Sequence, residues 1–465
     1  MSTVTSPAKA AGQELSGFQG ELIGPDDAGY GAACKVYNAM IDRHPALIAR
    51  CTGAEDVAKV VRFARDHDLL IAVRGGGHNG AGLGTCDDGV VIDLSPIKGI
   101  EVDPEARTAR VGGGCTWGEV DRATNEHGLA TPSGIISTTG VGGLTLGGGL
   151  GHLTRKCGLS IDNLLEAEVV LASGERVRAA ADEHPDLYWA IRGGGGNFGV
   201  VTSFLFRLHE VGTVVGGPTF WPIEATAEVL SAYRDFLPSA PRELNGFFAV
   251  TTVPPAPPFP EELHLRKVCG VVWCYAGADE GAAASAMAPL LDAVSEPLMH
   301  GVQPMPHPML QSAFDGLYPP GDQWYWRADF VNEIPDEAVQ LHARFGAEMP
   351  TMQSTMHLYP IDGAVHDVGS SDTAWSYRDA RWGAVFAGVD PDPGNVDAIR
   401  TWTIDYHEAL HPHSAGGAYV NMMMDEGQER VRASYRDNYD RLARIKAEYD
   451  PENTFRVNQN IQPQA

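Results

Sequence analysis

The stretch Arg74-Gly75-Gly76-Gly77-His78-Asn79 follows a short apolar segment, 69–73, and is the most informative part of this chain. Two further glycine-dense stretches lie at 140–151 and 193–199. Glycine lets several backbone N–H groups approach one anionic group closely, because it has no Cβ. Glycine turns at these three places therefore predict a backbone cradle for a large anionic cofactor.

The length and composition favour a globular protein of two domains. The chain has 465 residues, more than one hydrophobic core usually serves, and 43% of them are apolar. Acidic residues outnumber basic ones by 60 to 34, which gives a net charge of −26 and disfavours nucleic acid and anionic membranes as partners. Because we find no signal-like N-terminus and no long apolar run, we predict a cytoplasmic protein without a membrane segment.

The seven cysteines form no CxxC pair and no spacing typical of a metal site, and their number is odd. This usage suits a reducing compartment, where thiols mostly act as small buried apolar groups. We therefore expect neither disulfides nor a bound metal.

Hydrophobic periodicity predicts an α+β fold for the first 210 residues, with the glycines in the connections between elements. A composition change after Val211, where proline-rich segments appear between alternating strands, predicts the start of a second domain. We predict helices at 54–66, 117–127, 279–294, 336–345 and 429–449, and strands at 69–73, 90–94, 108–111, 167–171, 200–208, 263–268, 356–361 and, as an extended end, 453–463.

Taken alone, the individual residues leave several interpretations open. A G-x-G-x-x-G pattern is only approximate at 142–147, and no acidic residue closes a βαβ unit, so a Rossmann interpretation is weak. His78 could simply cap backbone groups at the end of a glycine turn, and Cys157 could be a buried free thiol. The glycines themselves could form ordinary tight turns.

Four ordered motifs together carry a family resemblance: RGGGHN at 74–79, TTGVGGLTLGGGLGHLTRKCGLSIDN at 138–163, GGGGNFGVVTSF at 193–204 and DPENTFRVNQNIQP at 450–463. They resemble the berberine bridge enzyme-like branch of the FAD-linked oxidases. The resemblance implies a PCMH-type FAD-binding domain over 1–211, with its core at 46–211. It also implies a substrate-binding domain over 212–424, built on an antiparallel β-sheet covered by helices, and a C-terminal segment, 425–465, that returns to the FAD domain.

The resemblance also implies how FAD is held. His78 matches the family position that bonds the flavin 8α-methyl carbon, and Cys157 matches the position that bonds C6 through sulfur, which predicts the bicovalent flavin subclass. An imidazole and a thiolate are nucleophilic enough for such bonds. The other residues predicted to contact FAD are Arg74, Gly75, Gly76, Gly77, Asn79, Thr139, Gly140, Gly142, Gly143, Gly147, Gly151, Asn163, Gly199, Val200, Asn458 and Asn460.

The catalytic base is less well defined. Tyr359 resembles the tyrosine of the family's Y-P-x-G-G stretch, and Tyr419 the first tyrosine of its A-Y-x-N-Y-x-D motif, but Met422 replaces the second. Where some relatives place a glutamate, this chain has Ala384. We predict Tyr359, Tyr419 and Tyr325 as catalytic residues, with His357 and Asp362 as further candidates, although a strand tyrosine is more often a packing residue. We also expect an open site lined by Tyr359, Tyr419, Met422, and Trp324 or Tyr325.

The resemblance implies an FAD-dependent oxidase that removes a hydride from a small organic substrate to flavin N5, with dioxygen reoxidising the flavin to give hydrogen peroxide. The alternatives are a dehydrogenase that uses another acceptor and a flavin-binding protein without turnover. Sugars, cyclic amines and alcohols are all possible substrates in this family. The expected partners are thus a small molecule and dioxygen, and the expected assembly is a monomer or homodimer.

Overall fold

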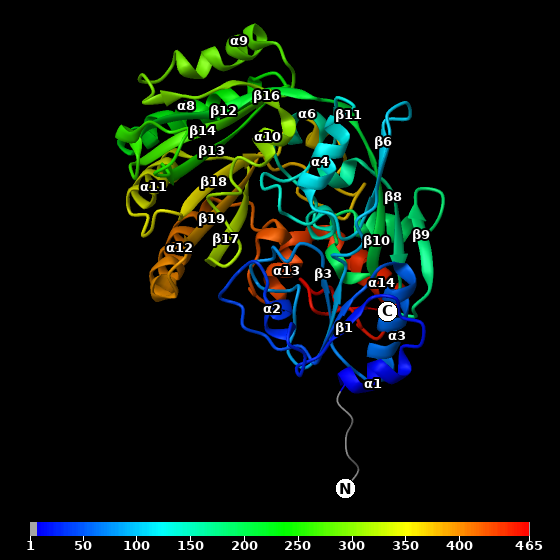
Figure 1. Cartoon of the computed structure of the whole chain (residues 1–465). Helices are drawn as coiled ribbons and strands as arrows, with labels where there is room; N and C mark the ends of the chain where they lie inside the picture. The colour runs from blue at the N-terminus through cyan, green and yellow to red at the C-terminus, as the bar shows by residue number, and fades with distance from the viewer. Residues whose placement is uncertain (1–6, 465) are drawn as a thin grey trace.

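The computed structural model describes residues 7–464, and Figure 1 shows its arrangement. A four-stranded sheet has the order β1-β2-β4-β3, with β2 and β3 both parallel to β4. Strand β4 is buried along its whole length, as is usual for a parallel strand covered on both faces. The bounds are β1 (Glu21–Ile23), β2 (Leu47–Arg50), β3 (Ile71–Arg74) and β4 (Val90–Asp93).

An antiparallel five-stranded sheet of order β5-β6-β10-β8-β9 lies beside it, and β7 pairs with β11 nearby. The bounds are β5 (Ile100–Asp103), β6 (Thr108–Gly112), β7 (Leu129–Ala130), β8 (Leu164–Val170), β9 (Arg176–Ala180), β10 (Val200–Arg207) and β11 (His209–Glu210). The helices of this half are α1 (Pro7–Glu14), α2 (Tyr30–Cys34), α3 (Ala54–Asp66), α4 (Trp117–Asn125), α5 (Val141–Leu146), α6 (Thr154–Cys157) and α7 (Pro185–Ile191).

The second half forms an eight-stranded antiparallel sheet of order β15-β12-β14-β13-β18-β19-β17, with β16 also paired to β12. The strands are β12 (Thr213–Pro222), β13 (Leu244–Thr252), β14 (Lys267–Tyr275), β15 (Met299–His300), β16 (Gln303–Pro306), β17 (Gln323–Val331), β18 (Thr355–Pro360) and β19 (Trp382–Asp390). The helices are α8 (Thr226–Phe236), α9 (Glu280–Leu291), α10 (His307–Gln311), α11 (Asp336–Ala347), α12 (Val396–Leu410), α13 (Gln428–Tyr435) and α14 (Tyr439–Tyr449).

Alternation along the strands gives this sheet two different faces. Met356 and Leu358 of β18 pack, with Phe386 of β19, into a core shared with α8, α9, α11 and α12. Tyr359 and Val385 point to the opposite face and join the core of the first half of the chain. The sheet therefore separates a helix-covered face from a face that meets the glycine-rich segments.

The predicted α+β class with an antiparallel sheet covered by helices is confirmed, and helix 54–66 is found at the predicted bounds. The domain limits at 211 and 424 stay a prediction. Residues 429–449 do not form one helix: α13 ends at Tyr435, and Arg436 takes a positive φ of 46° while its guanidinium lies 3.5 Å from the Tyr377 ring centroid.

Two strand predictions were also wrong. Residues 261–263 form a 3₁₀ turn and Leu265 has φ 61°, so the strand begins only at Lys267. The tail, 453–463, contains no strand. It is fixed instead by Asn197, whose Oδ1 accepts from Ile461 N at 2.9 Å and whose Nδ2 donates to Gln459 O at 3.1 Å.

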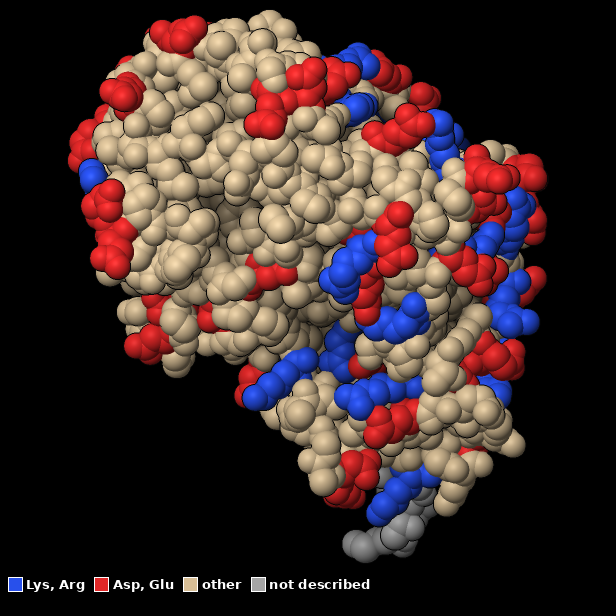
Figure 2. All heavy atoms as spheres, turned by 45° about the horizontal axis from the view of Figure 1, so that its top comes forward, with Lys and Arg blue, Asp and Glu red and all other residues tan. Residues whose placement is uncertain are grey.

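On the face shown in Figure 2, Lys and Arg side chains are interspersed with Asp and Glu and form no continuous basic patch. No helix among residues 7–464 is both long and apolar enough to cross a membrane.

Candidate functional site

A cavity of about 320 Å³ lies between the glycine-rich segments and the uncovered face of the eight-stranded sheet. Its walls come from the loop after β3, from residues 134–146, from 195–201, from β17, β18 and β19, and from the C-terminal segments 419–422 and 455–459. Segments far apart in the sequence thus meet at one site, and the volume is in the range of small-molecule sites.

Two of the glycine turns form one wall because they touch each other. A Cβ added to Gly76 would lie 2.4 Å from the backbone nitrogen of Gly140, and one added to Gly140 would lie 2.3 Å from that of Gly76. Only glycine allows this approach. Gly143 has open space where its Cβ would be, so the backbone there faces the cavity without a side chain.

His78 lies at the mouth of this cradle and lines the cavity. Its ring stacks on Tyr37 with centroids 3.9 Å apart, and its Nε2 lies 3.1 Å from Thr138 Oγ1. Burial lowers the pKa of His78 to about 4, so the imidazole is neutral at pH 7. When Nε2 carries the proton and donates to Thr138, the lone pair on Nδ1 is free to act as a nucleophile.

The structure corrects the prediction for Cys157. This residue ends α6 and packs with Leu153, Cys274 and Leu310 in a small apolar cluster, and none of the seven cysteines lines the cavity. Burial raises its pKa to about 12, so the side chain is a thiol rather than the nucleophilic thiolate. The interpretation as a buried free thiol fits this position, and the structure gives no basis for a second covalent link.

The structure brings many of the other predicted residues together. Asn79 accepts a hydrogen bond from Leu83 N at Oδ1, and Arg74 is held by Asp93 at 2.9 Å. The predicted site residues that line the cavity are Arg74, Gly75, Gly76, Gly77, His78, Asn79, Thr139, Gly140, Gly142, Gly143, Gly199, Val200, Tyr359, Tyr419 and Asn458.

Five other predicted site residues do not line the cavity. A Cβ on Gly147 would meet Asn421, and one on Gly151 would meet the Ser133 carbonyl, so these glycines serve close packing.

The other three also lie outside the cavity wall, and two of them are held there by their own contacts. Asn163 donates to the Cys157 and Leu159 carbonyls, both at 2.9 Å, and so shapes its own turn. Tyr325 faces the helix-covered side, beneath the guanidinium groups of Arg327 and Arg400. Asn460 is part of the C-terminal tail but does not reach the cavity wall.

Alternate residues of β18 form a polar part of the cavity wall: Thr355, His357 and Tyr359 all line the cavity. The Tyr359 hydroxyl lies 2.6 Å from His357 Nδ1. Burial raises the pKa of Tyr359 far above its ordinary value and lowers that of His357 to about 3, so both groups are neutral at pH 7. A neutral imidazole can accept the hydroxyl proton at Nδ1.

Tyr419 has a different environment. Its hydroxyl oxygen accepts from Gly149 N at 3.0 Å and from Asn421 Nδ2 at 2.7 Å. Burial raises its pKa to about 12. Tyr419 is therefore held by two donors and joins residues 419–421 to the glycine loop that ends at 151.

The remaining walls are largely apolar and aromatic. Trp324, Trp326, Tyr318 and Met422 line the cavity, whereas Ala384 points to the helix-covered side. The expected lining by Tyr359, Trp324, Tyr419 and Met422 is thus found, and the position where some relatives place a glutamate does not face the cavity in this chain. No Asp, Glu or Lys is among the described lining residues.

These features fit FAD. The glycine cradle gives backbone access to a pyrophosphate, and the Asn458 side-chain oxygen is buried without a hydrogen-bond partner among the described residues. Sequence reasoning missed Tyr37 and Tyr318, which line the same cavity. Nothing in their local sequence marks them, because only the fold brings them to His78 and Tyr359.

Family models agree with this site. An FAD binding domain matches residues 45–180, and a berberine and berberine-like domain matches 418–462. An FAD-linked oxidoreductase of Dictyostelium discoideum is 31% identical, with 92% of this chain and 91% of that protein covered. The (R)-6-hydroxynicotine oxidase of Paenarthrobacter nicotinovorans is 32% identical, with 96% and 97% covered. The chain therefore belongs to the berberine bridge enzyme-like family of FAD-linked oxidoreductases.

Solved structures show the same fold. The 6-hydroxy-D-nicotine oxidase of Arthrobacter nicotinovorans superposes with a TM-score of 0.85 at 28% identity, covering 96% of this chain and 98% of that one. A xylooligosaccharide oxidase from Myceliophthora thermophila has the same TM-score at 23% identity, with 98% and 100% covered, and supports the fold alone. The protein is thus an FAD-linked oxidoreductase and an enzyme.

Proposed function

We propose that this enzyme is an oxidase that removes a hydride from an aromatic or polycyclic alcohol or amine, with Tyr359 and His357 taking the proton. When bound, FAD would accept the hydride and pass the electrons to dioxygen, which gives hydrogen peroxide. The observation that carries the proposal is the 2.6 Å contact between Tyr359 Oη and His357 Nδ1 on the cavity wall.

The proton acceptor follows from the composition of the wall. Because no carboxylate and no lysine is among the described lining residues, only histidines and tyrosines remain there as bases. Tyr37 donates its hydroxyl to the Tyr318 carbonyl at 2.5 Å, and Tyr419 already accepts two hydrogen bonds. Of these three tyrosines, only Tyr359 has a second side-chain base, His357, within 3 Å of its hydroxyl oxygen.

The proton step balances within this pair. As the substrate C–H bond breaks and its electron pair leaves, the O–H or N–H proton of the substrate passes to the Tyr359 oxygen. The original Tyr359 proton moves to His357 Nδ1, and the substrate becomes a carbonyl compound or an imine. His357 is protonated only transiently, because burial lowers its pKa to about 3.

The walls favour an apolar substrate over a carbohydrate. Indole and phenol rings of Trp324, Trp326 and Tyr318, together with Met422, provide flat apolar contacts. The nicotine-type substrate named for the 32% identical relative fits this surface better than the oligosaccharide named for the 23% identical structure.

His78 is proposed as the one covalent attachment point, since its neutral ring has a free Nδ1 and no cysteine lines the cavity. The protein would act alone or as a homodimer in the cytoplasm, with dioxygen and a small molecule as its only partners.

Oxygen consumption tests the proposal directly. The purified flavoprotein would be supplied with benzylic and bicyclic alcohols, cyclic aromatic amines and oligosaccharides, with hydrogen peroxide measured in parallel. We expect turnover with peroxide from an aromatic substrate. Flavin bleaching without oxygen uptake would instead indicate a dehydrogenase. If no substrate bleaches the flavin, the result would indicate a flavin-binding protein without turnover.

A further inference from the structure

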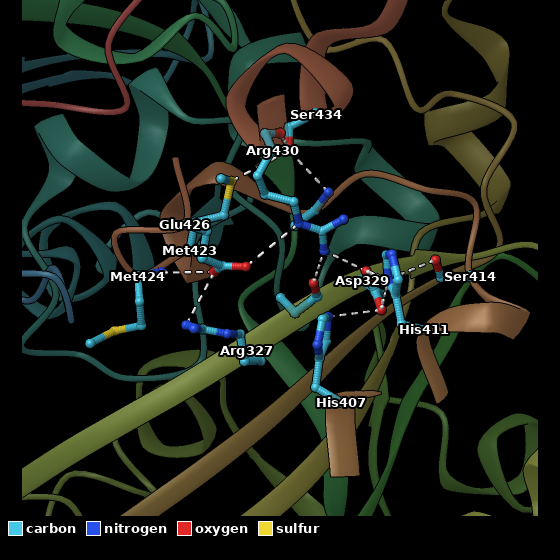
Figure 3. Close-up of polar contacts among 12 residues, drawn as sticks. Arg327, Asp329, His407, His411, Ser414, Met423, Met424, Glu426, Arg430 and Ser434 are labelled. Atoms are coloured by element: carbon cyan, nitrogen blue, oxygen red, sulfur yellow. Dashed lines mark hydrogen bonds and ion pairs between the residues drawn. The ribbon is translucent and has the colours of Figure 1, made fainter. Parts of the chain in front are cut away.

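A cluster of polar side chains, separate from the cavity, lies on the helix-covered side of β17. Its centre is Asp329 of β17, which is buried with a side-chain exposure of 2%. The side chains of His407, His411 and Arg430 converge on this carboxylate (Figure 3). His407 belongs to α12, His411 begins the 3₁₀ turn (His411–His413) that continues α12, and Arg430 belongs to α13.

The donor atoms are spaced as metal ligands are. Nε2 of His407 and Nδ1 of His411 each lie 3.1 Å from the same oxygen, Oδ2 of Asp329. All three donor atoms lie within 4.8 Å of one another. A tetrahedral centre with bonds of about 2.0–2.1 Å places its donors roughly 3.3 Å apart. Histidines four residues apart on a helix also project from one face.

His407 supplies an independent sign of a missing partner. Its Nε2 is buried and makes no hydrogen bond with any described residue, although Asp329 Oδ2 is only 3.1 Å away. The contact between the two groups is a close ion pair that lacks hydrogen-bond geometry. A ring nitrogen and a carboxylate oxygen that both bind one ion have a separation of this size, and a buried nitrogen without a hydrogen bond is costly.

Arg430 orients the carboxylate without occupying the oxygen that faces the histidines. Its Nη2 donates to Asp329 Oδ1 and to the Ala328 carbonyl, and Glu426 Oε2 lies 3.6 Å from its Nε. Asp329 thus keeps Oδ2 for the two imidazoles. A ligating carboxylate whose other oxygen is held by a neighbouring group is common in metal sites, because the neighbour fixes its direction.

We propose that Asp329, His407 and His411 bind one divalent transition-metal ion of the zinc type, with water as the fourth ligand. Two imidazoles and one carboxylate suit zinc better than magnesium or calcium, which prefer oxygen ligands alone. His411 is 44% exposed, so the ion can reach the site from solvent and the ring can rotate toward it. This site is separate from the cavity and from the proposed reaction.

The ion would stabilise a segment that contributes to the cavity. Arg430 also donates to the Gly416 carbonyl at 2.9 Å, so the cluster fixes both ends of the segment 416–430 against β17. Tyr419 and Met422 of this segment line the cavity. The role is therefore structural, and it does not depend on which substrate the enzyme oxidises.

Calorimetric titration with Zn²⁺ tests the site in the flavin-loaded protein after dialysis against a chelator. We expect one Zn²⁺ per chain in the wild type and in the control variant His413→Ala, which changes a histidine of the same turn outside the cluster. His407→Ala and His411→Ala are each expected to weaken binding by about 10-fold or more. His411→Ala is the deciding variant, because an exposed side chain can be removed without disturbing the core.

X-ray absorption on the Zn²⁺-loaded wild type gives a test that needs no variant. The expected first shell has two imidazole nitrogens and oxygen ligands at about 2.0–2.2 Å. The proposal is overturned if the wild type shows no saturable site, if all variants bind equally, or if the absorption spectrum shows fewer than two imidazoles.

Discussion

The two faces of the eight-stranded sheet are built from the same strands but have opposite characters. Along β18, His357 and Tyr359 face the cavity, whereas Met356 and Leu358 pack under the helices. Successive residues of one strand therefore alternate between lining the cavity and packing in the core that stabilises the fold. A similar contrast separates His78, which lines the cavity, from Cys157, which is packed away from it. Exposure to the cavity, rather than residue type, decides which side chains can react.

The largest expected effect concerns flavin retention. If His78 is the single attachment point, acid-precipitated wild type should stay yellow, and His78→Ala should release all its flavin to the supernatant. Cys157→Ala is the matched control and should release none, because its thiol is buried in a separate apolar cluster. Flavin absorbance of pellet and supernatant measures this, and flavin retained in the pellet of His78→Ala would restore a role for the cysteine as a second covalent link.

Next in size is the effect of Tyr359→Phe on the reductive half-reaction. Loss of one hydroxyl changes the volume little, so the fold should be kept, while anaerobic flavin reduction should slow by roughly 10²-fold or more. Rapid-mixing spectroscopy with a true substrate measures the rate. Tyr435→Phe is the control, since Tyr435 also lines the cavity but has no hydrogen-bond partner at its hydroxyl among the described residues. Equal rates for both variants would argue against Tyr359 as the base.

A substitution on the helix-covered face should lower the stability of the protein rather than the rate of flavin reduction. Leu358→Ala leaves a cavity in the core shared with α8 and α11, and should lower the free energy of unfolding by about 2–5 kcal/mol. Flavin reduction per folded molecule should stay close to that of the wild type. Denaturant unfolding measures the stability, and a slow reductive half-reaction in the folded variant would show that the two faces are coupled.

The effect that is smallest near neutral pH, and grows only as the pH falls, is a pH dependence from the covered face. His342 of α11 is buried beside the Tyr406 hydroxyl, and burial lowers its pKa from 6.5 to about 3. The folded protein therefore holds it neutral, while the unfolded chain protonates it near pH 6.5. Its contribution is fully present above pH 6.5 and is lost as pH falls toward 3, by up to about 1.4 kcal/mol per pH unit.

The matched variant His342→Gln should reduce this slope. Unfolding free energies between pH 4 and 8, compared for wild type and variant, measure the difference. The pKa of His411 shifts in the opposite direction to that of His342, because the side-chain hydrogen bond of His411 to Asp329 raises its pKa. An unchanged slope in His342→Gln would mean that the imidazole is already protonated in the folded state.

Sequence patterns predicted those features that depend on local geometry. The glycine turns marked the cradle because only glycine permits the contact between Gly76 and Gly140, and alternation placed His357 and Tyr359 on one face of a strand. The helix at 54–66 was likewise visible in its apolar spacing.

The tertiary structure decided what depends on distant contacts. Cys157 lies in a glycine-rich motif, but its side chain packs with Cys274 in an apolar cluster outside the cavity wall. Tyr37 and Tyr318 join the cavity from segments without any motif, and the tail at 453–463 is shaped by Asn197 rather than by strand pairing. Asp329, His407 and His411 meet only because α12 packs across β17. The sequence by itself thus determined which backbone could cradle a cofactor, because that is a property of single residues and short repeats. Which side chains reach the cofactor was decided by packing between segments hundreds of residues apart.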